Sequence, residues 1–123
     1  MPRKTLYILS AISVLGFATG LIFMPETFWG LFGGQVDSFG TWIGRLMTSN
    51  MLANIFLFWT LKDEPSSSKG AKLFSIGQVL AWGVMAIFLV FATLAEGLNF
   101  MAWATVGLGA VFAVLFAMDG FKN

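Results

Sequence analysis

Residues 5–24 read TLYILSAISVLGFATGLIFM, a run of 20 residues without a charged side chain. About 20 helical residues are needed to cross a hydrocarbon core that is roughly 30 Å thick. The run is therefore long enough to span a membrane, and its length is typical of a retained first span rather than of a cleaved secretory signal.

Three further stretches have the same character. Residues 73–95 and 97–118 carry no charge, and residues 41–61 carry only one, on Arg45. We therefore predict an all-α integral membrane protein, a four-helix bundle that forms a single domain over residues 1–123. The predicted spans cover approximately residues 5–24, 41–61, 73–95 and 98–118.

The composition agrees with a chain that lies almost wholly in a membrane. Of its 123 residues, 58% are hydrophobic and 11% are charged, whereas soluble domains carry about 25% charged residues. The absence of cysteine and histidine excludes disulfides, thiol chemistry and imidazole-ligated haem, zinc or copper. No catalytic motif is present, no carboxylate lies near a span centre, and the net charge of +1 argues against a nucleic-acid partner. We expect no enzyme and no cofactor, and leave a bound lipid or pigment open.

The cations indicate how the spans are oriented. Six of them lie before the first span, between the second and third, or after the fourth: Arg3, Lys4, Lys62, Lys69, Lys72 and Lys122. The opposite side carries Glu26, Asp37 and Glu96. By the positive-inside rule both termini should be cytoplasmic, and we expect the membrane to be a bacterial inner membrane.

The connection after the first span, residues 25–40, is too short to span a membrane and too apolar to be solvated. Pro25 suits the first turn of a helix. We predict a short interfacial helix at the level of the lipid headgroups, with a partner-binding knob as the alternative. Four apolar side chains should then lie at the membrane boundary or in a subunit contact: Phe28, Trp29, Leu31 and Phe32.

Small residues recur at helical spacing in two of the spans. Gly16 and Gly20 form a GxxxG pattern in the first span. The fourth span carries a small residue every four positions, at Thr105, Gly109, Ala113 and Ala117. Close approach through small residues joins helices in lipid, so these positions predict contacts within the bundle, with homo-oligomerisation as the alternative.

The second span holds most of the polar groups within the predicted bundle. At about 100° per residue, Arg45, Thr48 and Ser49 share one face of a helix, and Asn50 and Asn54 lie nearly opposite. A helix with polar groups on two faces should contact neighbouring helices on both sides.

Arg45 is the strongest single candidate for a functional residue, because an ionisable group inside a membrane usually has a function. It lies near the outer end of its span, at the depth expected for Glu26 and Glu96. We predict an ion pair between Arg45 and one of these acids, and the alternative is that Arg45 anchors a lipid phosphate or an anionic ligand. Gln78, in the third span, should form a hydrogen bond inside the bundle.

The first half of the chain has three features that it shares with a known group of proteins. Met24-Pro25-Glu26 follows the first span, Gly33-Gly34 ends the apolar segment, and Trp42-Ile43-Gly44-Arg45 opens the second span. In these features the chain resembles small bacterial four-span membrane proteins of unknown function, DoxX-like in layout. The resemblance implies an integral four-helix membrane protein and implies no activity.

Two functions of different classes are compatible with these features. We expect a non-enzymatic accessory or scaffolding subunit that packs against a larger membrane protein complex and against lipid. Its predicted interface residues are Phe28, Trp29, Phe32, Gly16, Gly20, Gly109 and Ala113. The alternative is a small-molecule or lipid-binding membrane protein or carrier with a site formed by Arg45, Ser49, Asn50 and Asn54.

Overall fold

The computed structural model describes residues 2–122, and within them the chain forms five α-helices and no strand. The helices are α1 (Arg3–Phe23), α2 (Pro25–Leu31), α3 (Ser38–Leu61), α4 (Lys69–Glu96) and α5 (Phe100–Gly120). Three of the described helices, α1, α4 and α5, are long and apolar enough to cross a membrane. The all-α prediction is confirmed, and these helices mark the chain as a membrane protein. Polar residues lower the hydropathy of α3, which at 24 residues is otherwise long enough.

Local sequence signals set the helix ends. The side chains of Asp37, Ser68 and Asn99 cap the first turns of α3, α4 and α5 by accepting hydrogen bonds from backbone N–H groups that have no partner in the helix. α4 ends before Gly97, whose φ of 65° is left-handed and therefore favours glycine. As a result α5 begins at Phe100, two residues after the expected start of the fourth span.

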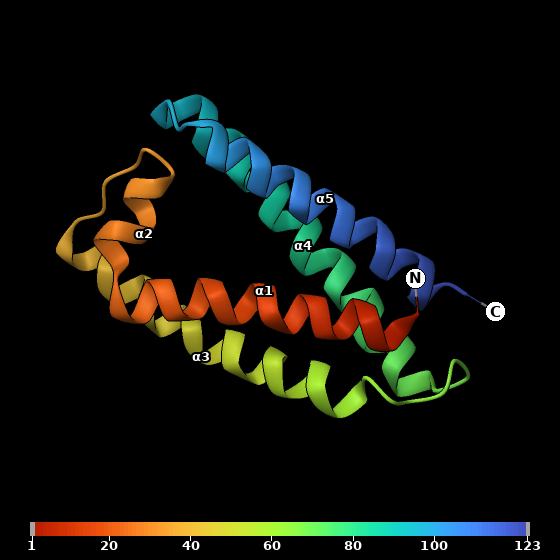
Figure 1. Ribbon diagram of the computed structural model, residues 1–123. Coiled ribbons are helices and arrows are strands. Elements are labelled where there is room, and N and C mark those ends of the chain that lie inside the picture. Colours follow the sequence, from red (N-terminus) through yellow and green to blue (C-terminus); the bar gives the residue numbers. More distant parts are fainter. Residues whose placement is uncertain (1, 123) are drawn as a thin grey trace.

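The four long helices form two antiparallel pairs. α1 packs along α3, and α4 packs along α5 (Figure 1). The pairs meet at the end of the molecule that holds both termini and diverge toward the other end, where α2 lies between them. The long helices thus outline a V, and each pair leaves much of its apolar surface uncovered.

An aromatic cluster joins the pairs at the closed end of the V. Each long helix contributes one ring: Tyr7 from α1, Phe58 from α3, Phe74 from α4 and Phe116 from α5. The ring centroids of Tyr7 and Phe58 are 5.5 Å apart, and Phe58 lies 5.1 Å from Phe74 and 5.7 Å from Phe116. Tyr7, Phe58 and Phe116 are fully buried. Such ring pairs contribute about 0.5–1.5 kcal/mol each beyond the area they bury.

The short helix α2 bridges the open end of the V. It begins at Pro25, as the sequence predicts, and Gly33 follows its end with a φ of 78°. The Asn99 side chain donates to Leu31 O at 2.9 Å, and the Asn99 backbone N–H donates to Phe32 O at 3.0 Å. α2 is therefore tied to the turn between α4 and α5 as well as to the end of α1.

Candidate functional site

A buried polar cluster lies beside the aromatic rings at the closed end. Arg3 Nε donates to both oxygens of Asp119, at 3.2 and 2.9 Å, and the two side chains are 6% and 3% exposed. Ser75 Oγ lies 2.6 Å from Asp119 Oδ2 and 2.6 Å from the Tyr7 hydroxyl. A carboxylate only accepts, so Ser75 donates its single proton to Asp119 and accepts from Tyr7, whose single proton is shared between Ser75 Oγ and Ala71 O. The hydrogen bonds run from Tyr7 through Ser75 to Asp119.

The cluster also holds the connection between the two helix pairs. Arg3 Nη1 donates to Pro65 O at 2.6 Å and lies 3.4 Å from Glu64 O. The Tyr7 hydroxyl lies 2.9 Å from Ala71 O. These contacts join the start of α1, the end of α5 and the loop before α4. The side chains of the cluster are buried and bond mainly to one another, and within the described residues Arg3 Nη2 is left without a hydrogen-bond partner. The contacts hold the helices together.

Sequence reasoning missed this ion pair. The charge pattern alone groups Arg3 with the cytoplasmic cations and predicts no partner for Asp119. A signal was present, because Arg3 lies just before the first uncharged run and Asp119 directly follows the last one. Two charges of opposite sign at the same expected depth are candidates for pairing.

The loop side of this end carries a small charged hollow of about 360 Å³. Asp63 is exposed there and lies 3.0 Å from Lys62 Nζ and 3.4 Å from Lys4 Nζ. The hydrogen bond from Lys62 lowers the pKa of Asp63 below its ordinary value. Exposed pairs of this kind are screened by water and salt and add little to stability.

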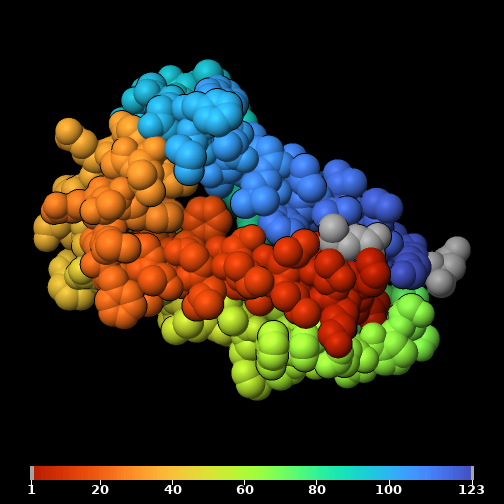
Figure 2. Space-filling view, in the orientation of Figure 1, coloured from red at the N-terminus to blue at the C-terminus, as the bar shows by residue number. Residues whose placement is uncertain are grey.

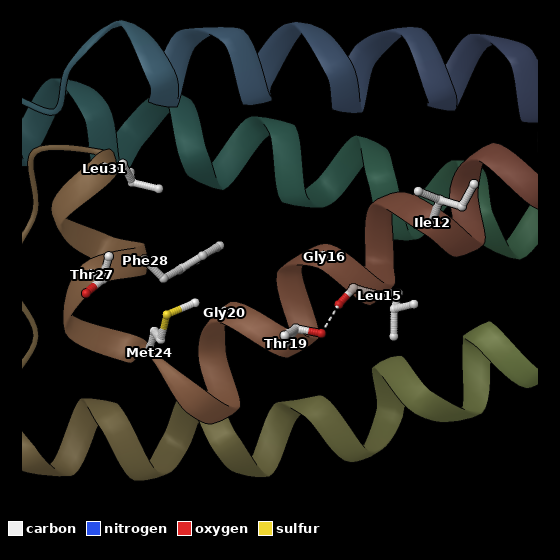
Figure 3. Close-up of a pocket in the computed structure, with 9 residues that line it drawn as sticks. All are labelled: Ile12, Leu15, Gly16, Thr19, Gly20, Met24, Thr27, Phe28 and Leu31. Atoms are coloured by element: carbon white, nitrogen blue, oxygen red, sulfur yellow. Dashed lines mark hydrogen bonds between the residues drawn. The ribbon is translucent and has the colours of Figure 1, made fainter.

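An apolar groove runs along α1 and α2, with a volume of about 490 Å³. Its walls are formed by Ile12, Leu15, Gly16, Thr19, Gly20, Met24, Thr27, Phe28 and Leu31. Figure 3 shows the side chains of Ile12, Phe28 and Leu31 on the side of α1 and α2 that faces α4 and α5. The surface is hollowed at the same place, where α1 and α2 face α5 (Figure 2). Groove and hollow lie within the open part of the V.

Three of the predicted interface residues, Gly16, Gly20 and Phe28, line this groove, whereas Trp29 and Phe32 lie outside its lining. The Phe28 ring lies against Gly20, where an added Cβ would be 2.6 Å from Phe28 Cδ2, so Gly20 is needed to seat α2 on α1. Phe32 is buried, with 4% of its surface exposed, and the Trp29 ring is tilted by 60° against the Phe32 ring, with the centroids 6.0 Å apart. Gly16 differs, because nothing lies within 4 Å of a Cβ built there.

The other two predicted interface residues lie between α4 and α5. A Cβ at Gly109 would be 2.8 Å from Met85 Cε and 3.2 Å from Trp82 O. Ala113 packs at the edge of the aromatic core. Gly109 therefore allows close packing of α5 on α4 within one molecule.

Arg45 makes none of the ion pairs predicted for it, and that prediction is wrong for the described residues 2–122. The salt bridges there are Arg3–Asp119, Lys4–Asp63 and Lys62–Asp63. Arg45 Nε instead donates to Ile22 O, at 3.2 Å, in the last turn of α1. The last four carbonyls of a helix lack helical partners, and a basic side chain there also faces the negative end of the helix dipole. Arg45 therefore caps α1 at the break before Pro25.

The four residues of the predicted ligand site are not gathered into one site. Asn54 Oδ1 accepts a hydrogen bond from Gln78 Nε2 at 3.3 Å, which links α3 to α4 and gives Gln78 the hydrogen bond expected of it. Ser49 Oγ donates to Leu46 O, at 2.8 Å, within its own helix. Asn50 is exposed, and no hydrogen bond joins it to Arg45 within residues 2–122.

The described residues offer no obvious centre for a metal. Within residues 2–122, no three His, Cys, Asp or Glu side chains lie close enough together to hold an ion. Comparison of the chain with protein-family models, curated proteins and solved structures finds no match.

Proposed function

We propose that the protein is a non-enzymatic accessory or scaffolding subunit of a larger membrane protein complex, docked through the α1–α2 groove. In this proposal α1, α3, α4 and α5 all cross the bilayer of a bacterial inner membrane, in the layout of the DoxX-like proteins. The observation that carries the proposal is the groove: a hollow of about 490 Å³ with almost wholly apolar walls, open between two helix pairs.

The hydrogen bonds of α3 support its placement as a fourth span. Thr48, Ser49 and Thr60 each donate to a backbone carbonyl one turn earlier in the same helix, and Asn54 is paired with Gln78. Polar groups that are satisfied internally can lie in lipid without the cost of an unpaired donor or acceptor. α3 can thus cross a bilayer despite its lower hydropathy, with Asn50, which is exposed near the middle of the helix, as the exception among these side chains.

The distribution of lysines supports cytoplasmic termini. Besides Arg3, which is paired with Asp119, the closed end carries five lysines, of which Lys4 and Lys62 pair with exposed Asp63: Lys4, Lys62, Lys69, Lys72 and Lys122. The open end of the V carries Glu26, Asp37 and Glu96. Lysine and arginine near span ends set orientation far more strongly than acids do, so the closed end is placed in the cytoplasm.

The groove suits a partner's side chains better than a reaction. Its walls carry two hydroxyls, on Thr19 and Thr27, and no charged group. Thr19 Oγ1 already donates to Leu15 O at 2.8 Å. Gly16 opens the groove floor, although a glycine within a helix costs about 1 kcal/mol relative to alanine. Small residues at such positions let another helix approach closely.

The proposal is tested by filling the groove. Gly16→Leu places a side chain where a Cβ meets open space, so the variant should fold normally. Gly77→Leu is the matched control, since Gly77 is also exposed and also has open space, but lies on α4 outside the groove. Tagged proteins are extracted gently from native membranes, and their masses are measured by size-exclusion chromatography with light scattering.

We expect wild type and Gly77→Leu to elute in a stoichiometric complex with a larger membrane protein, and Gly16→Leu to elute alone. Wild-type protein that elutes alone, or a partner that survives the Gly16 change, contradicts the proposal. A lone chain that retains a lipid, released by Gly16→Leu, would instead support a lipid-binding protein.

A further inference from the structure

α3 has the same arrangement at both of its ends, a tryptophan followed three residues later by a cation that lies over the indole. Arg45 Cζ is 5.1 Å from the ring centroid of Trp42, and Lys62 Nζ is 4.2 Å from that of Trp59. The two tryptophans are 60% and 57% exposed. Their separation along the sequence corresponds to about 26 Å of helix, close to the hydrocarbon thickness of roughly 30 Å. Both pairs therefore lie where a bilayer has its headgroups.

The two cations differ in how they are satisfied. Lys62 Nζ donates to Asp63 Oδ2 at 3.0 Å and to Trp59 O at 3.3 Å, so its charge is balanced within the protein. Arg45 donates only through Nε, to Ile22 O. Within residues 2–122, neither of its Nη groups has a hydrogen-bond partner, and no carboxylate lies within 4.0 Å of the guanidinium. Two amino groups of Arg45 are left for an external acceptor.

The surroundings of Arg45 indicate what that acceptor is. Trp42 lies against the guanidinium, Leu46 follows Arg45 in α3, and Phe23 follows Ile22 in α1; they are 60%, 68% and 74% exposed. A guanidinium among lipid-facing apolar side chains is unfavourable without a counter-ion. Side chains of a helix lean toward its N-terminus, and the contact with Trp42 shows that Arg45 does so here. The charge is thereby carried toward the headgroups at the open end.

We propose that Arg45 and Trp42 form a binding site for the phosphate of a phospholipid in the leaflet that faces away from the cytoplasm. The two Nη groups of a guanidinium match two phosphate oxygens. The hydrogen bond to Ile22 O and the Trp42 ring hold the guanidinium in place. This inference rests on the proposed passage of α3 through the bilayer, but not on a partner in the α1–α2 groove.

The test compares a lipid with a phosphate and a lipid without one. Native mass spectrometry of detergent-purified protein measures binding of phosphatidylglycerol and of a phosphate-free galactosyl diacylglycerol. We expect one tightly bound phosphatidylglycerol and no bound galactolipid. Arg45→Gln should weaken this binding about ten-fold or more, as expected for a lost charge-assisted hydrogen bond. Lys62→Gln changes the cation that is already paired with Asp63, so it should leave phosphatidylglycerol binding unchanged.

Trp42→Leu keeps the hydrogen bond from Arg45 to Ile22 and tests the site even if Arg45→Gln fails to fold. The Trp42 variant should weaken phosphatidylglycerol binding several-fold, because the guanidinium loses the indole ring that holds it in place. Equal binding of the two lipids, or equal losses in the Arg45 and Lys62 variants, would overturn the site. Displacement of the lipid by millimolar inorganic phosphate would also overturn it, since the site would then take a soluble anion. Gly16→Leu should keep the phospholipid, so this proposal and the groove proposal fail separately.

Discussion

Removing the carboxylate of Asp119 should be among the most destabilising single changes in the molecule. Asp119→Ala leaves the buried guanidinium of Arg3 without its counter-ion and removes the acceptor for Ser75. Hydrogen bonds to charged groups are worth about 1.5–3 kcal/mol each, so two lost donors predict roughly 3–6 kcal/mol. Breaking a buried ion pair by removing one partner independently predicts about 3–5 kcal/mol. We expect a loss of about 3–5 kcal/mol in the free energy of unfolding.

The assay is reversible unfolding in mixed micelles, followed by circular dichroism as denaturing detergent is added. The double variant Arg3→Met with Asp119→Leu removes both charges at similar volume and should recover much of the loss. Asp63→Ala is the matched control, because it removes a carboxylate from an exposed ion pair at the same end of the molecule. That variant should unfold like wild type.

The reasoning is refuted if Asp119→Ala stays within about 1 kcal/mol of wild type, which is the range of an exposed pair. Water would then reach Arg3 and Asp119, and the closed end of the V would not be sealed. A double variant that is no more stable than Asp119→Ala would show that the loss comes from packing and not from an unpaired charge.

Three further predictions concern the Tyr7 hydroxyl, the packing of α5 on α4, and the orientation of the chain in the membrane. Tyr7→Phe keeps the buried ring but removes the hydroxyl that lies 2.6 Å from Ser75 and 2.9 Å from Ala71 O; in the same unfolding assay it should cost about 1–2 kcal/mol, and wild-type stability would argue against the directed hydrogen bonds. Gly109→Ala should cost about 1–3 kcal/mol because its Cβ would lie 3.2 Å from the backbone at Trp82, whereas Gly107→Ala, which meets open space, should be neutral or stabilising; equal effects would contradict the α4–α5 packing. A reporter that is active only in the periplasm should remain silent when fused to the C-terminus, and an active fusion would reverse the proposed orientation.

Much of the secondary structure could be predicted because its causes are local. A helix forms over an uncharged run because lipid leaves no other partner for the backbone, and the thickness of the bilayer sets its length. Pro25 begins α2 for an equally local reason, since its fixed φ suits a first helical turn. Gly109, which belongs to the predicted stripe of small residues, does lie at a close contact between α5 and α4.

Arg45 shows what local reasoning cannot supply. An ion pair was predicted because acidic side chains are visible in a sequence, whereas the observed acceptor is the backbone carbonyl of Ile22. Every residue carries a carbonyl, so only the position of α1 against α3 makes this one available. The sequence marked Arg45 as a residue to explain, but its partner came from the packing of two helices.

The positions of the long helices, the side of them that carries most of the positive charge, and the lack of thiol and imidazole groups all follow from the order of the amino acids. Three features are visible only in the folded chain: α1 pairs with α3 and α4 with α5, the pairs diverge around a groove, and Arg3 meets Asp119 across 116 positions of sequence. The physical reason is that lipid solvates all apolar helices about equally well, so the lipid itself does not select which helices pair. Which of them pair depends on how their surfaces fit, through small residues, aromatic rings and buried hydrogen bonds.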